Sequence, residues 1–486
     1  MQDLENKIRV GLAWSGFTQV GGQVATLVVT IILMRLLSPQ DFGLIAMVLV
    51  FTGFAMFFTD MGFGAALVQK MDVEQRHKNA VFWISVAVGA LLTLIFAAVA
   101  PYIASFYGVP ELQPIVVVIS LIFFINSLGT ITESLVEKAM DFRTLAIAQL
   151  TSTVLCGLVA IYLALSGFGV WSLVAMYVVN AIVYVVVVWI LAPWRPEFSL
   201  QLSAVRDLSK FGTDWLGATI FYYWTRNGDN LLIGRYLGSA PLGIYSRSYA
   251  ILLMPVTQIA GVISNVMFPA LSAIQNDVER VRALYLQSIS VISLAAFPCT
   301  LGLLVVSRPF VLTLFGDEWA GMIPLVQVFS ILGAIQSIGA TGSWLYQSQG
   351  RTGIMFRWGL VTGSIYVVSF IVGLRWGALG VAVAYTVANF VLWYPNWSIP
   401  AHIIDLSFAT MLRSLAPQFY GAATMALAVW AFGLVLPNSW SYAAHLALQV
   451  SFGAAVYLVF VRSFHLEAYT TASNVVKSYL RQRRAD

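Results

Sequence analysis

Residues 211–239 have the sequence FGTDWLGATIFYYWTRNGDNLLIGRYLGS, and the rest of the chain is organised around this stretch. The segment is apolar and long enough to cross a bilayer as a helix, yet it carries charge in its interior. Arg226 lies about 13 Å along the helix axis from Arg235, at ~1.5 Å per residue. An ionised group near the bilayer centre costs at least ~2.5 kcal/mol on insertion scales, so it normally faces a wet cavity or a partner. The stretch therefore predicts a membrane helix with one polar side.

The polar residues of this segment share one helix face. At ~100° per residue, an arc of roughly 120° contains Asp214, Ala218, Tyr222, Thr225, Arg226 and Asp229. Asn227 and Asn230 lie beside that arc. Two interpretations remain open, namely an internal Arg226–Asp229 ion pair that only orients helices and the polar wall of a central cavity. We favour the cavity wall.

The composition is that of a polytopic helical membrane protein. The 486 residues are 59% hydrophobic and 10% charged, with a mean hydropathy of +0.84. A soluble domain of this length could not hide so much apolar surface. Repeated apolar runs of ~20 residues, not alternating segments of ~10, favour helices over an outer-membrane barrel. We attribute the net charge of +5 to membrane topology and expect no nucleic-acid partner.

The residue types needed for common enzyme chemistries do not occur in the required patterns. The cysteines and histidines show neither disulfide nor metal-ligand spacing. The sequence contains no Walker A, HExxH, CxxC or GxSxG motif. A membrane glycosyltransferase or ligase would show acidic residues in a long external loop, and the longest predicted one, 307–321, offers only Asp317 and Glu318. We therefore expect no enzymatic activity, cofactor or metal.

We predict an all-α protein with about fourteen transmembrane helices, each needing ~20 apolar residues. The predicted spans are 11–35, 42–68, 79–101, 113–137, 144–166, 169–192, 211–235, 242–271, 283–306, 322–347, 353–374, 377–399, 411–436 and 441–461. Lys and Arg concentrate in alternate connections and near both ends of the chain. By the positive-inside rule, both termini are cytoplasmic. We expect no cleavable signal peptide, because Lys7 and Arg9 precede a run that is long enough to span.

The first and second halves of the chain also resemble each other in sequence. RLLSPQDFG at 35–43 matches RYLGSAPLG at 235–243 at an offset of 200, and weaker matches follow at similar offsets. These matches predict two six-helix lobes in parallel repeat, 1–200 and 201–405, which would enclose a substrate path. Two additional helices (406–462) and a basic cytoplasmic tail (463–486) would follow.

Further candidate site residues lie outside the first stretch. Within 242–271, Arg247, Gln258 and Asn265 fall within about 20° of one another on a helix. Asp60, near the end of its span, and Asp214 are the candidates for coupling to an ion. We interpret Glu133 as part of a solvated cytoplasmic turn that continues to Arg143.

Several motifs resemble one branch of a known transporter superfamily. RxLSPxDFGL at 35–44, DxGxGxALVQ at 60–69 and RNxDNLLIGRxLG at 226–238 are similar to the polysaccharide transporter branch, with its Wzx-type flippases, of the multidrug/oligosaccharidyl-lipid/polysaccharide (MOP) exporter superfamily. FPA at 268–270 and FGxxW at 315–319 resemble its colanic-acid-type exporters. The resemblance spans about 1–400.

The resemblance implies a flippase for undecaprenyl-diphosphate-linked oligosaccharide repeat units. Such a protein works by alternating access in the bacterial cytoplasmic (inner) membrane, for exopolysaccharide, capsule or O-antigen (lipopolysaccharide) synthesis. Its partners would be the lipid-linked oligosaccharide, membrane lipids, and polymerase and chain-length or export proteins of the same pathway. Arg226 and Arg247 would suit the diphosphate, and Asn227, Asn230 and Tyr222 the sugar. The alternatives are an ion-coupled exporter of small molecules with the same architecture and a membrane glycosyltransferase or ligase.

Overall fold

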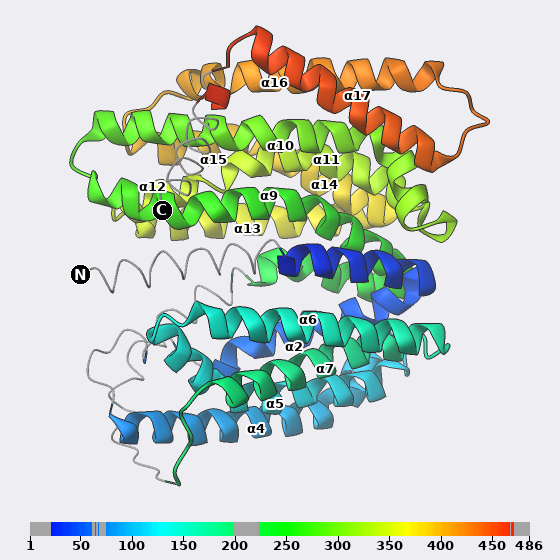
Figure 1. Cartoon of the computed structure of the whole chain (residues 1–486), viewed down its shortest axis with the longest axis vertical. Helices are drawn as coiled ribbons and strands as arrows, with labels where there is room; N and C mark the ends of the chain where they lie inside the picture. Colours follow the sequence, from blue (N-terminus) through cyan, green and yellow to red (C-terminus); the bar gives the residue numbers. More distant parts are fainter. Residues whose placement is uncertain are drawn as a thin grey trace, which may run out of the picture. The chain divides into compact units, whose positions relative to one another are not determined.

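The computed structural model describes residues 21–60, 64, 67, 74–198, 221, 223–466 and 468–470, and the elements it describes are helices (Figure 1). The chain divides into two units, Met1–Gly243 and Ile244–Asp486. The described helices of each unit are mostly long and apolar.

In the first unit, helices that are close together in the sequence pack against one another. Its helices are α2 (Pro39–Asp60), α4 (Gln75–Tyr107), α5 (Leu112–Lys138), α6 (Phe142–Leu165) and α7 (Val170–Leu191), with further helical segments at 21–36 and 223–237. The main contacts are α4 with α5, α6 with α7, and α5 with α7. The start of α2 is fixed by reciprocal hydrogen bonds. The Ser38 backbone N–H donates to Asp41 Oδ2 at 3.0 Å, and the Asp41 N–H donates to Ser38 Oγ at 3.3 Å.

The second unit is organised around one long helix, α10 (Val278–Leu314). The other elements are α9 (Ser239–Ala273, beginning just before the unit boundary), α11 (Met322–Gly339), α12 (Gly342–Ser348), α13 (Thr352–Gly373), α14 (Gly377–Val391), α15 (Trp393–His402), α16 (Phe408–Val435) and α17 (Tyr442–Ser463). Short 3-10 turns lie at Asp317–Trp319 and Leu374–Trp376. Helices α11, α16 and α17 all pack on α10.

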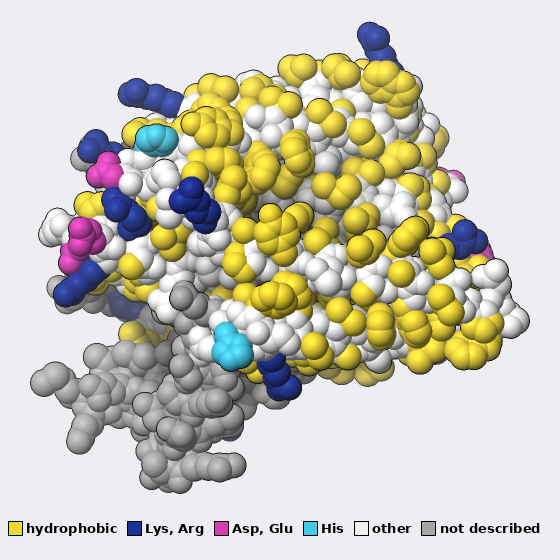
Figure 2. Space-filling model, turned by 90° about the horizontal axis from the view of Figure 1, so that it is seen from above, with side chains coloured by type: hydrophobic (Ala, Val, Ile, Leu, Met, Phe, Trp, Pro, Cys, Tyr) yellow, Lys and Arg dark blue, Asp and Glu magenta, His cyan; other side chains and the backbone are white. Residues whose placement is uncertain are grey.

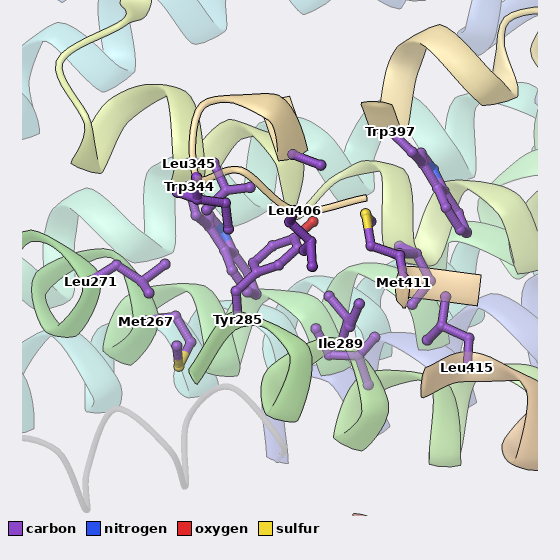
Figure 3. Packing of buried hydrophobic residues seen from close by; sticks show 14 of the residues in the cluster. Met267, Leu271, Tyr285, Ile289, Trp344, Leu345, Trp397, Leu406, Met411 and Leu415 are labelled. Carbon is purple, nitrogen blue, oxygen red and sulfur yellow. The ribbon is translucent and has the colours of Figure 1, made fainter. Parts of the chain in front are cut away.

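The core of the second unit joins α10 to helices far apart in the sequence. Tyr285 and Ile289 of α10 lie among Trp344 of α12, Trp397 of α15 and Met411 of α16 (Figure 3). The Tyr285 hydroxyl hydrogen-bonds the Thr341 hydroxyl at 2.9 Å. Helix α16, which follows the predicted repeat, therefore contributes to the core of this unit.

Much of the exposed surface is apolar, as expected for a membrane protein. Ten stretches of the described chain are long and apolar enough to cross a bilayer, one of them running through α13, α14 and α15. Leu94 and Ile190 are 68% and 71% exposed, which is unfavourable in water but not in lipid. Figure 2 shows a face that hydrophobic side chains cover broadly, while most Lys and Arg side chains gather toward its ends. The prediction of an all-helical multi-pass membrane protein is confirmed, and each predicted span overlaps a described helix.

One predicted loop is wrong. The sequence predicts an external loop over about 307–321, but α10 continues to Leu314 and Asp317–Trp319 forms a 3-10 turn. Pro298 and Pro309 lie inside α10 without ending it. Neighbouring helices and local adjustments satisfy the carbonyls that a proline leaves free in a membrane bundle, so helix ends cannot be located from prolines alone.

Candidate functional site

A cavity of about 870 Å³ lies within the first unit. Its walls come from α2, α5, α6 and α7, together with Gly64. The polar part of the lining includes Asn126, Glu133, Glu137, Gln149, Asn180 and Tyr184. We call this space the acidic cavity, because the described part of its lining has two carboxylates and no Lys, Arg or His. A polar space in an apolar helix bundle is a default candidate for a binding site.

Glu133 is held in the cavity wall by a hydrogen bond between helices. The Tyr184 hydroxyl of α7 donates to Glu133 Oε1 of α5 at 2.8 Å. The interpretation of Glu133 as part of a solvated turn is therefore wrong. Helix α5 continues to Lys138, and the turn begins at Ala139, after Glu133 and Glu137 have taken their places on the helix.

Amide groups on α6 and α7 complete the polar wall of the cavity. Asn180 Nδ2 of α7 donates to Ser152 Oγ of α6 at 3.3 Å. On α6 itself, Gln149 Nε2 donates to Thr153 Oγ1 at 3.3 Å. These bonds orient both amides and join α6 to α7 beside the cavity.

The spacing of these residues was a signal that the sequence analysis missed. On α5, Asn126, Thr130, Glu133 and Glu137 are separated by four, three and four residues. Such spacing places polar groups on one face of a helix. Tyr177, Asn180 and Tyr184 of α7 follow the same rule. A polar face repeated on two apolar helices indicates a shared polar space.

The helical segment at 223–237 packs against α2, which forms one wall of the cavity. The Tyr223 hydroxyl donates to the backbone oxygens of Val50 at 2.7 Å and Leu49 at 3.2 Å. A Cβ on Gly53 would lie 2.7 Å from that hydroxyl. Leu49 and Gly53 also line the acidic cavity, so this segment supports the cavity wall.

The structure places the predicted residues of this segment outside the acidic cavity. Arg226 is exposed, whereas Asp229 is only 3% exposed and its Oδ1 accepts from the Asn230 backbone N–H at 2.8 Å. Asn227 Nδ2 donates to the Tyr223 carbonyl oxygen at 3.0 Å. None of these residues is part of the cavity lining. Both the ion-pair and the polar-wall interpretations of this segment stay predictions.

The remaining predicted residues are described only in part. Arg247 is half-buried on α9, in the second unit. Asp214 and Tyr222 lie outside the described residues, as do the side chains of Asp60, Gln258 and Asn265. Among the residues that the structure describes, no group of three or more His, Cys, Asp or Glu could hold a metal ion.

Fold and cavity together define a multi-pass α-helical membrane transporter, and comparisons with known proteins narrow that class. A family model described as "Polysaccharide biosynthesis protein" matches residues 32–324, and the chain belongs to this family. The teichuronic acid biosynthesis protein TuaB of Bacillus subtilis is 28% identical over 94% of this chain and 96% of its own length. The lipopolysaccharide biosynthesis protein WzxC of Escherichia coli is 26% identical over 89% of each chain.

Solved structures show the same fold. The lipid II flippase MurJ, in an inward closed conformation, covers 94% of this chain and 98% of its own with a TM-score of 0.76 at 13% identity. A multidrug resistance MATE family transporter of the MOP superfamily covers 80% of this chain and 96% of its own with a TM-score of 0.64 at 14% identity. The resemblance found in the sequence is confirmed. The chain belongs to a family of polysaccharide biosynthesis proteins, and it shares its fold with the flippase MurJ and with a MATE transporter.

Proposed function

We propose that the protein flips undecaprenyl-diphosphate-linked oligosaccharide repeat units from the cytoplasmic to the periplasmic leaflet of the bacterial inner membrane. The single observation that carries this proposal is a polar cavity inside an apolar helix bundle, in a chain of this transport family. The substrate has an oligosaccharide that needs a polar path and a lipid that does not. An apolar outer surface beside a polar interior suits both parts.

The relatives support a polysaccharide precursor as cargo. One is named as a succinoglycan biosynthesis transport protein, from Rhizobium meliloti, and is 28% identical over 72% of this chain. Two others are named for teichuronic acid and lipopolysaccharide biosynthesis. These products differ chemically, so the property they share is a sugar polymer made at a membrane. We therefore propose a precursor of a sugar polymer as the cargo, without specifying which sugars it contains.

Charge on the first unit is compatible with two parts of such a substrate. Arg226 is exposed, and a guanidinium binds phosphate oxygens through paired N–H groups. The acidic cavity, by contrast, offers acceptors and amides. Alternating access would move the head group between leaflets while the lipid stays in the bilayer. By the positive-inside rule, both termini would lie in the cytoplasm.

A second candidate function is ion-coupled export of small molecules. The acidic lining of the cavity favours it, because carboxylates attract cations. A membrane glycosyltransferase or ligase is set aside, because a relative is named as a transport protein and the expected external loop is largely helix.

Deleting the gene in its own host tests the proposal. We expect surface polysaccharide to fall and lipid-linked repeat units to accumulate with their sugars facing the cytoplasm. Radiolabelled repeat units can be assayed in spheroplasts with a glycosidase that does not cross the membrane. Protection from the enzyme in the deletion strain, reversed by the wild-type gene, is the supporting result. Unchanged amount and accessibility of the repeat units would refute the flippase and leave the small-molecule exporter.

A further inference from the structure

The residues that follow α7, 192–198, lie across the start of α4 (Figure 1). We call this segment the strap, and its sequence is APWRPEF. The strap is not helical, and the backbone of Ala192 is extended, with φ −83° and ψ 139°. Pro193 and Pro196 favour this form, because each ring fixes φ near −65° and disfavours the helical region for the residue before it. The sequence therefore predisposes the strap to an extended conformation.

Side chains of α4 bind the backbone of the strap at Glu197. The Glu197 N–H donates to Asn79 Oδ1 at 3.2 Å, and Asn79 Nδ2 donates to Glu197 Oε2 at 3.4 Å. The Trp83 indole N–H donates to the Glu197 carbonyl oxygen at 3.0 Å. Asn79 is only 1% exposed, so its amide is held in place by the surrounding protein. Both backbone polar groups of Glu197 are therefore satisfied by α4.

Aromatic rings form a second set of contacts between the strap and α4. The Trp194 indole N–H donates to Gln75 Oε1 at 3.2 Å, and its ring centroid lies 5.8 Å from that of the buried Phe82. Phe198 packs on Trp83 with ring centroids 5.1 Å apart. Edge-to-face arrangements of this kind are favourable for aromatic pairs. Trp194 thus joins the strap to the hydrophobic core of the first unit.

The contacts on the two segments are spaced to match. Gln75, Asn79 and Trp83 are four residues apart, which places them on one face of α4. They extend over ~12 Å, at ~1.5 Å per residue of helix. From Trp194 to Phe198 an extended chain covers ~13 Å, at ~3.3 Å per residue. The strap therefore runs along α4 in register with this face.

The indole N–H groups around the strap bind protein acceptors. Those of Trp83 and Trp194 donate to the Glu197 carbonyl oxygen and to a glutamine of α4, as described above. Arg195 Nη1 donates to the carbonyl oxygens of Ala192 and Trp194, at 2.7 Å each. A Trp that only anchors a protein at the membrane interface would direct its N–H toward the lipid head groups. This pattern favours attachment of the strap to α4 over attachment to lipid.

We propose that the strap anchors the connection from α7 to the helical segment at 223–237 and stays bound to α4 during transport. This connection leads from the first predicted lobe to the second. The described part of the cavity lining includes Tyr177, Asn180 and Tyr184 of α7 and no residue of α4. With the strap bound, a pull on the connection reaches α4 and leaves the cavity wall of α7 in place. The inference rests on the proposed function, because it assumes that the lobes move during export.

Hydrogen–deuterium exchange of the full chain in lipid nanodiscs tests whether the strap is bound. The Glu197 amide should exchange slowly in the wild type, because it donates to a buried acceptor. Trp83→Phe keeps a ring beside Phe198 but removes the indole donor, so exchange in the strap should become roughly fivefold faster. The matched control is Trp171→Phe, which removes an indole that is 38% exposed at the start of α7. Equal exchange in the wild type and in Trp83→Phe would overturn the assignment of this bond to the strap.

A chemical bridge tests whether the strap must stay bound during export. The pair Asn79→Cys, Glu197→Cys is made in a Cys156→Ser, Cys299→Ser background, which has no other cysteine. Because the pair lacks the Asn79 hydrogen bonds, we expect it to export about tenfold less than the background, normalised to protein in the membrane. Dibromobimane enters cells and fluoresces when it bridges two neighbouring thiols. Bridging should restore export to that of the background, and each single cysteine variant treated with the reagent should stay impaired.

Three results would overturn the anchor. Export at the background level by the unbridged pair would show that strap binding is not needed. Absence of bridging fluorescence would show that the strap does not lie on α4, and failure of the bridge to restore export would show that the strap must leave α4.

The proposed function is judged separately from the anchor. If deletion of the gene leaves repeat units unchanged, the flippase is wrong, and the exchange measurement still decides whether the strap is bound. If deletion causes repeat units to accumulate while the unbridged pair exports normally, only the anchor is wrong.

Discussion

Gly43 of α2 and Ser239 at the start of α9 meet backbone to backbone, so closely that a Cβ on Gly43 would overlap the Ser239 carbonyl. The reverse contact also exists, because a Cβ on Gly243 would overlap the Pro39 carbonyl oxygen. Residues 39 and 43 correspond to 239 and 243 at the offset of 200 found in the sequence. The two matching motifs therefore contact each other through equivalent positions. This symmetry gives a physical reason for glycine at both places.

We predict that Gly43→Ala and Gly243→Ala destabilise the protein, because the added methyl group has only backbone to meet. Overpacking of this kind costs about 1–3 kcal/mol. The measurements are the melting temperature of the purified protein and its amount in the membrane. Gly359→Ala is the control, since Gly359 lies inside α13 with no atom within 4 Å of the added Cβ. Similar melting temperatures for all three variants would contradict the steric argument.

The membrane helices could be predicted from the sequence, because the length of an apolar run is enough to identify a membrane span. The prediction failed at the end of α10, where an external loop is predicted from residue 307 and the helix continues to Leu314. It also failed at Glu133. The charges from Glu133 to Arg143 look like a solvated turn, and the partner that fixes Glu133 is 51 residues away. The spacing of polar residues within one segment was enough to indicate Arg226 as a candidate site residue. The acidic cavity is built from four helices, so predicting it would have required the contacts between segments that are far apart in the sequence.

The Tyr184–Glu133 hydrogen bond should contribute measurably to stability. A hydrogen bond to a charged group is worth about 1.5–3 kcal/mol, so Tyr184→Phe should lower the melting temperature. The effect should be smaller in a Glu133→Gln background, because a neutral amide oxygen is a weaker acceptor. Tyr162→Phe is the control, since Tyr162 is 70% exposed near the end of α6. Equal losses for Tyr184→Phe in both backgrounds would mean that the two residues are not coupled.

Topology can be checked with reporters that distinguish the two sides of the membrane. Fusions after Arg76, Arg206 and Arg481 should report cytoplasm, because these positions follow even numbers of predicted spans and lie in basic connections. A reporter near Asp317, in the 3-10 turn after α10, should report periplasm. Alkaline phosphatase and green fluorescent protein fusions give opposite signals and control for each other. A periplasmic signal after Arg206 would rule out six spans in the first predicted lobe.

Arg226 provides the sharpest test of how the diphosphate is bound. Arg226→Lys keeps the charge but loses the planar fork that binds two phosphate oxygens together. We expect export to fall at least about tenfold, which corresponds to ~1.4 kcal/mol of lost interaction. The measurement is complementation of polysaccharide export in the deletion strain, normalised to protein in the membrane. Arg280→Lys is the matched control, because Arg280 has a side chain that is 77% exposed and lies in a cytoplasmic connection of the predicted topology.

The double variant Arg226→Gln, Asp229→Asn separates binding from structure. Asp229 is only 3% exposed, so removing Arg226 alone would be harmful if the arginine served mainly to compensate that buried carboxylate. Neutralising both residues would then restore folding and export, because the uncompensated charge is what destabilises such a pair. We expect instead that the double variant reaches the membrane at wild-type levels and still fails to export, because the phosphate has lost its guanidinium. Recovery of export would assign Arg226 a structural role and require a different cation, such as Arg247, for the diphosphate.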